Sequence, residues 1–206
     1  MAVVYCLRIA WFLRFQPGRE RQGKTGPADT STMKGILYSW AIIAQPWAME
    51  SSRRMFFLYL QFVVFHLGVA AAILLSFIIP YAPALLESRW LVLAFAGVTA
   101  AAAAVGLIRM VRRISGRHMR AISSPDDYFS LGLLTVWLLS AVFASPNNTA
   151  QEGPLLAFFI LTAFFLVYVP FSKISHYLYY PFTRYYFGKS MGYRGVYPVR
   201  HGPKAG

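Results

Sequence analysis

Four long apolar segments, separated by short polar loops, follow one another between residues 55 and 181. The first three segments are residues 55–79, 90–108 and 128–144, and the fourth starts at Pro154. About 20 mainly apolar residues cross the hydrocarbon core of a bilayer as a helix, so each segment is long enough, or nearly so, to span a membrane. We therefore predict four transmembrane helices, and we expect the last to continue as helix past Phe171 toward Pro181.

The residues between these segments predict where the helices begin and end. Pro80 should stop the first span, because proline has no N–H for the helical ladder. Ser124 and Pro125, followed by Asp126 and Asp127, are typical of a helix start and do not favour a proton relay. The five arginines between residues 109 and 120 predict an inner loop before that start.

The first 54 residues contain two shorter apolar segments. Residues 1–15 are too short to span a bilayer, and Arg8 interrupts them. They are either the inner half of a first helix whose outer half is missing from the sequence, or a short interfacial anchor. Residues 35–48 carry Trp40 and Trp47, which favour the headgroup level, and predict an interfacial helix on the inner surface.

These elements predict an all-α integral membrane protein. We expect a bundle of four full transmembrane helices, with a short or truncated first helix and an interfacial helix. The chain then has three segments. Residues 1–54 hold the partial first helix, a basic loop and the interfacial helix, residues 55–181 form the transmembrane bundle, and residues 182–206 form a basic, tyrosine-rich tail.

Composition and charge agree with this organisation and set its sidedness. The chain is 57% hydrophobic, with a mean hydropathy of +0.48. Its net charge of +13 would suggest nucleic-acid binding in a soluble protein. Here, however, 18 of the 20 Lys and Arg residues fall in the segments that the spans place on one side. The positive-inside rule puts that side, with the C-terminus, in the cytoplasm, and nucleic acid is not expected as a partner.

Two of the four histidines belong to apolar helices and are candidate metal ligands. His66 lies eleven residues beyond Met55, about 16 Å along the helix axis, and His176 lies toward the inner end of the last helix. Such histidines are usually functional, or else link helices by hydrogen bonds. We interpret His118 and His201 as solvated surface residues. Two neutral imidazoles on one iron would give a six-coordinate haem b suited to electron transfer.

Small and basic residues accompany this histidine pair. The small ones follow His66 or lie on the neighbouring span: Gly68, Ala70, Ala71, Ala72, Gly97 and residues 100–104. They leave room for a porphyrin, but they are equally typical of close helix packing. Arg112, Arg113 and Lys173 either pair with the haem propionates or only anchor the chain on its inner side. Cys6 is the only cysteine and the sequence has no C-x-x-C-H motif, so the haem would be held non-covalently.

Three stretches carry a family resemblance. The first is Phe65-His66-Leu67-Gly68-Val69, the second is Pro170-Phe171-Ser172-Lys173-Ile174-Ser175-His176, and the third runs from Arg112-Arg113 through Asp127. In the same order, they resemble three stretches of one family. The first is similar to the haem-ligand stretch of that family's second helix, and the second to the P-F-S-(R/K)-x-x-H stretch that closes its last helix. The third is similar to its inner loop between helices three and four. That family is the gamma subunit of membrane-bound respiratory nitrate reductase, and the resemblance covers roughly residues 55–182.

The resemblance implies a five-helix cytochrome b of the prokaryotic cytoplasmic (inner) membrane. Such a subunit relays electrons between the quinone pool and a cytoplasmic iron–sulfur or other redox subunit. His66 and His176 match the ligands of the family's inner haem. Ser76 and Phe158 stand where the family has the ligands of its outer haem, so the resemblance implies a single haem b.

An alternative function is a haem-free membrane anchor that recruits a cytoplasmic complex. Under both interpretations the spans are surrounded by membrane lipid, and the chain holds no complete active site of its own. We expect the tail, residues 182–206, to dock the partner subunit, because its tyrosines favour burial against another surface.

Overall fold

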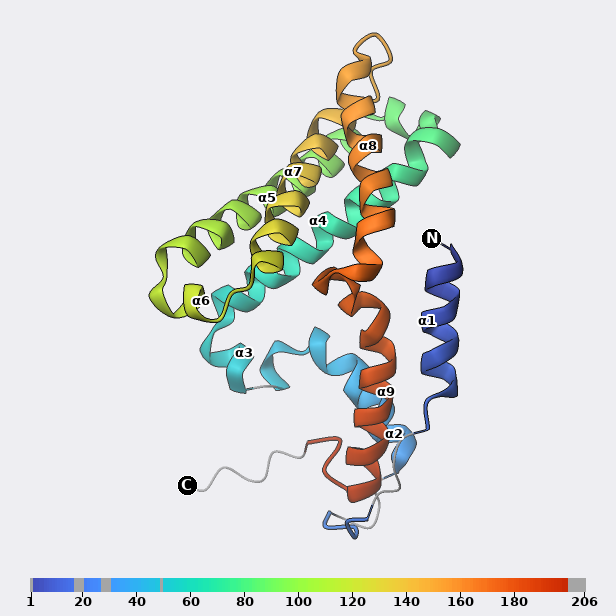
Figure 1. Ribbon diagram of the computed structural model, residues 1–206, viewed down its shortest axis with the longest axis vertical. Coiled ribbons are helices and arrows are strands. Elements are labelled where there is room, and N and C mark those ends of the chain that lie inside the picture. Colours follow the sequence, from blue (N-terminus) through green and yellow to red (C-terminus); the bar gives the residue numbers. More distant parts are fainter. Residues whose placement is uncertain (1, 17–20, 27–30, 49, 200–206) are drawn as a thin grey trace. The chain divides into compact units, whose positions relative to one another are not determined.

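A computed structural model describes residues 2–16, 21–26, 31–48 and 50–199, and within them all regular structure is helical. Figure 1 shows the α-helices and their order along the chain. They are α1 (Ala2–Arg14), α2 (Thr32–Ala41), α3 (Glu50–Arg54), α4 (Phe56–Tyr81), α5 (Arg89–Ser115), α6 (Arg117–Ala121), α7 (Pro125–Ala144), α8 (Glu152–Tyr168) and α9 (His176–Arg194). Short 3-10 turns are η1 (Ile42–Ala44), η2 (Pro46–Ala48), η3 (Pro83–Glu87), η4 (Val169–Phe171) and η5 (Lys173–Ser175).

Among the described residues, four helices are long and apolar enough to cross a membrane. They are α4, α5, α7, and α8 together with η4. Only 22–33% of the most apolar window of each span is buried within the protein. The remaining apolar side chains are exposed, and lipid is the solvent that suits them. The expectation of an all-α, multi-pass membrane protein is therefore confirmed.

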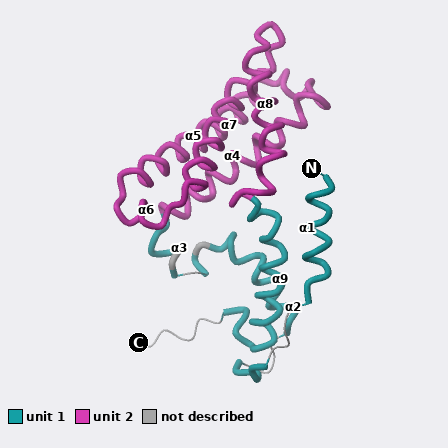
Figure 2. The backbone as a smooth tube through the Cα atoms, in the orientation of Figure 1, with its two compact units in different colours: residues 1–56, 175–206 teal, residues 57–174 magenta. Residues whose placement is uncertain are grey.

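The chain forms two compact units, which Figure 2 distinguishes by colour. Unit 2 comprises residues 57–174, and unit 1 combines residues 1–56 with residues 175–206. This division differs from the three predicted segments, because the residues after Ile174 associate with the N-terminal helices. The predicted boundary at residue 182 instead falls inside α9, which continues to Arg194.

Unit 2 has an apolar core in which aromatic rings meet between α7 and α8. Phe158 is fully buried, and its ring stacks on that of Trp137 with centroids 6.0 Å apart. The indole N–H of Trp137 donates to Thr162 Oγ1 at 2.9 Å, so the ring satisfies its one polar group within the core. On α4, a Cβ added at Gly68 would lie 2.1 Å from the Cβ of Ala102. The missing side chain therefore lets α4 and α5 touch.

Unit 1 depends on close packing of α2 against α9. A Cβ at Gly188 would lie 2.7 Å from the carbonyl oxygen of Gly35, and one at Gly35 would lie 2.4 Å from Gly192 Cα. The two backbones therefore approach closely enough to exclude any side chain between them. After Arg194 the chain turns at Gly195, whose φ of 79° is a left-handed conformation that glycine adopts without strain.

Several predicted helix boundaries are wrong. Pro80 does not stop α4, which ends one residue later at Tyr81. α5 continues through the expected inner loop to Ser115, because arginine is a good helix former and the stretch has no breaker before Gly116. The interfacial segment is helical, but α2 ends at Ala41 and η1 and η2 follow it. Its place at the membrane surface stays a prediction.

The predicted start of α7 is confirmed. Ser124 is the N-cap, Pro125 follows at the first position, and Asp126 and Asp127 lie in the first turn. The Ser124 backbone N–H donates to Asp127 Oδ2 at 2.8 Å, as in a capping box.

The expectation that the last span continues as helix past Phe171 is wrong. α8 ends at Tyr168, and Ser172 has extended backbone angles of φ −106° and ψ 171°. Pro170 offers no N–H, so the ladder is already interrupted there. His176 is consequently the first residue of a separate helix, α9.

We predict that Gly188→Val loosens unit 1. The new side chain would meet Gly35 and Ile36 backbone atoms that cannot give way, and overpacking of this kind costs about 1–3 kcal/mol. In detergent, trypsin should therefore cut at Arg184 and Arg194 about tenfold faster than in the wild type. Gly23→Val is the matched control, because nothing lies within 4 Å of its added Cβ. Equal cleavage of the two variants would contradict the packing described above.

Candidate haem-binding site

The imidazole of His66 makes a hydrogen bond within its own helix that fixes its tautomer. His66 lies on α4 with an exposed side chain, and its Nδ1 is 2.8 Å from the carbonyl oxygen of Phe62. A carbonyl oxygen only accepts hydrogen bonds, so Nδ1 carries the proton and the lone pair of the neutral ring lies on Nε2. Metal-binding histidines commonly make this second contact, which fixes both the tautomer and the ring orientation.

Aromatic rings surround this imidazole on its own helix. The ring centroid of Phe62 is 4.1 Å from that of His66, and the ring of Phe65 is 6.3 Å away in an edge-on arrangement. Phe62 therefore contacts His66 twice, once through its carbonyl and once through its ring. These contacts limit the rotamers of His66.

The small residues near His66 divide into two groups. One group packs helices together and is buried: Gly68, Ala72, Ala102 and Ala103. The other group is exposed: Ala70, Gly97, Ala100, Ala101 and Ala104. A Cβ added at Gly97 would have no heavy atom within 4 Å. The exposed group alone leaves space beside the helices, so part of the predicted porphyrin slot is instead a helix contact.

His176 is the second predicted ligand, and its side chain is also exposed. It opens α9 directly after the 3-10 turn η5. His66 belongs to unit 2 and His176 to unit 1, and each is placed within its own unit. Their pairing on one iron stays a prediction. Of the other histidines, His118 is exposed on α6, and His201 lies outside the described residues.

The cations predicted to bind propionates have a closer partner that the sequence did not suggest. Lys173 Nζ lies 2.8 Å from Asp127 Oδ2 and donates to Ser124 Oγ at 2.8 Å. Arg113 Nη1 lies 3.8 Å from the same Asp127 oxygen. Asp127 therefore neutralises part of the positive charge assigned to the propionates, whereas Arg112 is exposed on α5.

Asp126 joins the start of α7 to the break after α8. Its Oδ1 accepts hydrogen bonds from the Tyr168 hydroxyl and, at 3.3 Å, from Ser130 Oγ. Its Oδ2 accepts the backbone N–H of Lys173 at 3.2 Å. The carboxylate thus satisfies an N–H that the interrupted ladder cannot. We name these residues the polar junction: Ser124, Asp126, Asp127, Ser130, Tyr168 and Lys173.

Sequence reasoning treated the acids of the polar junction only as a helix cap and overlooked Tyr168 and Ser130. One signal was available, because two adjacent acids at the entrance of an apolar segment are rarely left without basic or hydroxyl partners. Which partners they have depends on how α7 and α8 pack, and the spacing of the residues does not reveal it.

Arg109 is a further residue that the pattern did not single out. Its guanidinium carbon lies 5.6 Å from the ring centroid of Phe65, the residue next to His66. A cation–π contact of this kind holds a positive charge within one side chain of the candidate ligand. Arg109 is therefore as well placed as Arg112 to act on an anionic group bound near His66.

Comparison with known proteins assigns the chain neither a family nor an activity. No family model and no solved structure matches the chain. The chain is similar to a protein of Nitratidesulfovibrio vulgaris (strain Hildenborough) whose description is only "Protein". The two are 25% identical over 176 residues, which cover 82% of this chain and 76% of that protein. The match extends over most of both chains but carries no named activity.

We predict that Asp126→Asn destabilises the polar junction. The variant loses the charge that accepts three hydrogen bonds, two of them from the partly buried hydroxyls of Ser130 and Tyr168, at a total cost of about 1–3 kcal/mol. The unfolding temperature in detergent should fall by about 2–4 °C for each kcal/mol. Glu152→Gln, which changes an exposed acid at the start of α8, should leave it unchanged. An unaltered unfolding temperature for Asp126→Asn would contradict a structural role for the junction.

Proposed function

We propose that the protein is a membrane cytochrome b subunit with one haem b, held by His66 and His176. It relays electrons between the quinone pool and a cytoplasmic iron–sulfur or other redox subunit. The multi-pass helical fold agrees with this proposal, and the two histidine motifs resemble those of the nitrate reductase gamma subunit. Catalysis then belongs to the assembled complex.

The observation that carries the proposal is the hydrogen bond between His66 Nδ1 and the Phe62 carbonyl. This bond puts the proton on Nδ1 and the lone pair of the neutral ring on Nε2, one of the two ring nitrogens through which histidine binds metals. The side chain of His66 is exposed, which supports access of a planar group to it.

The residues at the outer-haem positions support a single haem. Phe158 is fully buried against Trp137, and its ring fills the core of unit 2. Ser76 donates its hydroxyl to the carbonyl oxygen of Ile73 at 2.6 Å. Neither side chain is suited to ligate iron in the way that a histidine does.

The bound haem would supply one-electron chemistry, and the residues of the chain would hold it and set its surroundings. His66 and His176 would provide two neutral nitrogen ligands, which leave no open coordination position and favour electron transfer over oxygen chemistry. Arg109 and Arg112 would offer positive charge to the propionates. Lys173 and Arg113 share their charge with Asp127, so we assign them a smaller part in holding the haem.

The charge distribution supports an inner-membrane location with the C-terminus in the cytoplasm. In that orientation the basic segments of the chain lie on the side where a soluble redox subunit would dock. Exposed aromatic and apolar residues of α9 and the turn after it, Tyr185, Phe187, Tyr193 and Val196, are available for that contact. The same surface would serve a haem-free anchor, which is the second candidate function.

The purified protein should show a b-type signal in a dithionite-reduced minus oxidised spectrum, with about one haem per chain. His66→Ala and His176→Ala should each abolish the signal, because each would remove one of the two proposed nitrogen ligands. His118→Ala, which changes an exposed histidine of α6, should leave the signal intact. A colourless wild-type protein would rule out the proposal and favour the haem-free anchor. Loss of haem only in His118→Ala would show that the ligands are assigned wrongly.

Arg109→Gln should lower the midpoint potential of the haem. A nearby positive charge stabilises the reduced form, which carries one more electron, so its removal favours the oxidised form. Redox titration of the absorbance measures the shift, and Arg117→Gln on α6 is the control with the same loss of charge. Equal potentials in the Arg109 variant and the wild type would remove Arg109 from the site.

A further inference from the structure

The corner between α5 and α6 presents two arginines at the end of a membrane span. Figure 1 shows α6 directly after the end of α5, and both helices belong to unit 2. Gly116 separates them, and its extended backbone, with φ −78° and ψ 117°, turns the chain there. Arg117 and Arg120 are exposed and lie three residues apart on α6, so their side chains are neighbours on one face of that helix.

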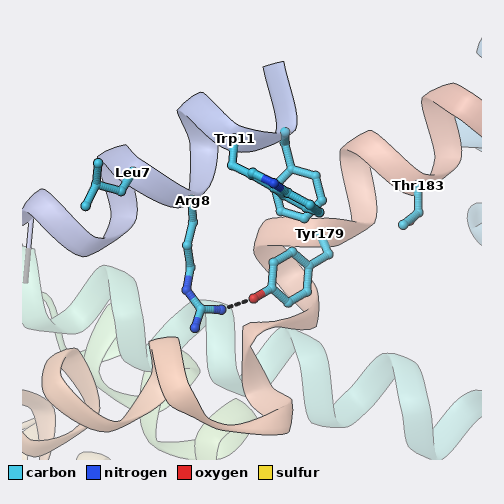
Figure 3. A pocket seen from close by; sticks show the side chains of 6 residues that line it. Leu7, Arg8, Trp11, Tyr179 and Thr183 are labelled. Atoms are coloured by element: carbon cyan, nitrogen blue, oxygen red, sulfur yellow. Dashed lines mark hydrogen bonds between the residues drawn. The ribbon is translucent and has the colours of Figure 1, made fainter. Parts of the chain in front are cut away.

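Several other arginines of the protein hold parts of its fold together. Figure 3 shows one of them in the pocket between α1 and α9, where Arg8 donates to the Tyr179 hydroxyl. Arg113 does the same at the α5–α6 corner, because its Nη1 donates to Ser123 Oγ at 2.6 Å. This bond ties the end of α5 to the residues after α6 and keeps the corner closed.

Arg120 makes a second bond across the corner without losing its charge. Its Nη1 donates to the carbonyl oxygen of Ile114, on the last turn of α5, at 3.0 Å. A carbonyl is neutral, and the guanidinium has further N–H donors to offer. The bond therefore fixes where the charge of Arg120 lies and leaves it able to bind an anion.

The two arginines of α6 are not balanced by acids of the chain. Within the residues that the structure describes, the ion pairs are those of Glu50 with Arg54 and of Asp127 with Arg113 and Lys173. Neither Arg117 nor Arg120 belongs to any of them. Their positive charge therefore favours an anionic partner from outside the described residues.

The length of α5 brings this corner to the level of the lipid headgroups. α5 has 27 residues, which extend about 40 Å at 1.5 Å per residue, whereas the hydrocarbon core is about 30 Å thick. Arg89 begins the helix and Arg113 lies in its last turn, and neither charge is tolerated in the hydrocarbon. Both ends of α5 therefore reach the headgroups, and α6 follows directly from one of them.

Exposed apolar side chains lead along α5 to the same corner. Leu107, Val111 and Ile114 follow each other at intervals of four and three, which places them on one helix face. Their exposed fractions are 52%, 64% and 55%. The stripe ends at the residue whose carbonyl oxygen holds Arg120. A cation at the end of an apolar stripe fits a phospholipid, whereas a free phosphate or an acidic protein would make use of the cation alone.

We propose that the α5–α6 corner binds one anionic phospholipid. Its phosphate lies between Arg117 and Arg120, and one acyl chain runs along Ile114, Val111 and Leu107. Arginine is suited to phosphate because its planar guanidinium offers two parallel N–H donors, and basic residues at a membrane surface attract anionic headgroups. The site goes beyond the proposed function, shares no residue with the proposed haem site and does not depend on a bound haem.

Native mass spectrometry of the full chain in detergent tests this site by counting bound lipids. Phosphatidylglycerol should remain bound as a single molecule at concentrations where phosphatidylcholine of the same chain length does not. Arg117→Gln should weaken phosphatidylglycerol binding about fivefold, and Arg117→Lys, which keeps the charge, should weaken it less. Arg89→Gln is the matched control, because it removes one exposed arginine from the opposite end of α5, and it should change binding less than twofold.

A second variant tests the apolar part of the site without changing the charge. Val111→Ser shortens the exposed stripe and should also weaken phosphatidylglycerol binding, and unfolding temperatures in detergent show whether each variant is still folded. Unchanged binding in this variant, equal binding of the two phospholipids, or equal loss in Arg117→Gln and Arg89→Gln would each overturn the proposal. Displacement of the lipid by glycerol phosphate or by polyglutamate at equal concentration would also overturn it, and would assign the corner to a soluble phosphate or to an acidic protein.

Discussion

The fold depends on how the last membrane segment satisfies its backbone where the helix breaks. Within a bilayer an N–H without a partner costs several kcal/mol, so a helix cannot simply stop at depth. Here Pro170 interrupts the ladder, and the carboxylate of Asp126, on another helix, accepts the N–H of Lys173. Asp127 holds the side chain of the same lysine. Two acids that precede Lys173 by more than forty residues therefore hold the backbone and the side chain of this residue near the end of unit 2.

This constraint explains where sequence reasoning succeeded and where it could not. The four spans were predictable because their signal is local: long apolar runs separated by polar residues. The start of α7 was predictable for the same reason, since Ser124, Pro125 and two acids are adjacent. The break before His176 was not fully predictable. Pro170 is a local signal that the ladder is interrupted, but a membrane helix can also continue past a proline. Asp126, the partner that stabilises the break, lies on a different helix, and no local pattern records that contact.

The residues of the candidate site likewise fall into those that the sequence identified and those that only the packing of the helices reveals. His66 was identifiable as an ionisable residue in an apolar helix, and its useful tautomer follows from a carbonyl only four residues earlier. Arg109 was not singled out, because its position over Phe65 depends on how α4 and α5 pack. Lys173 and Arg113 were identified as inner-side cations, but their charge is shared with Asp127. Charge can be counted from a sequence, whereas its neutralisation depends on tertiary contacts.

The composition of unit 1 has a consequence for the biosynthesis of the protein. α2 packs on α9 at Gly35 and Gly188, and the four spans lie between these helices in the sequence. During synthesis, α1 and α2 emerge from the ribosome before the four spans, and α9, which packs on α2, follows only after all four spans have been made. Their apolar surfaces must be accommodated throughout membrane insertion. Unit 1 is thus completed only after the four spans, and the docking surface that we propose on α9 is displayed only by chains whose spans have already been synthesised.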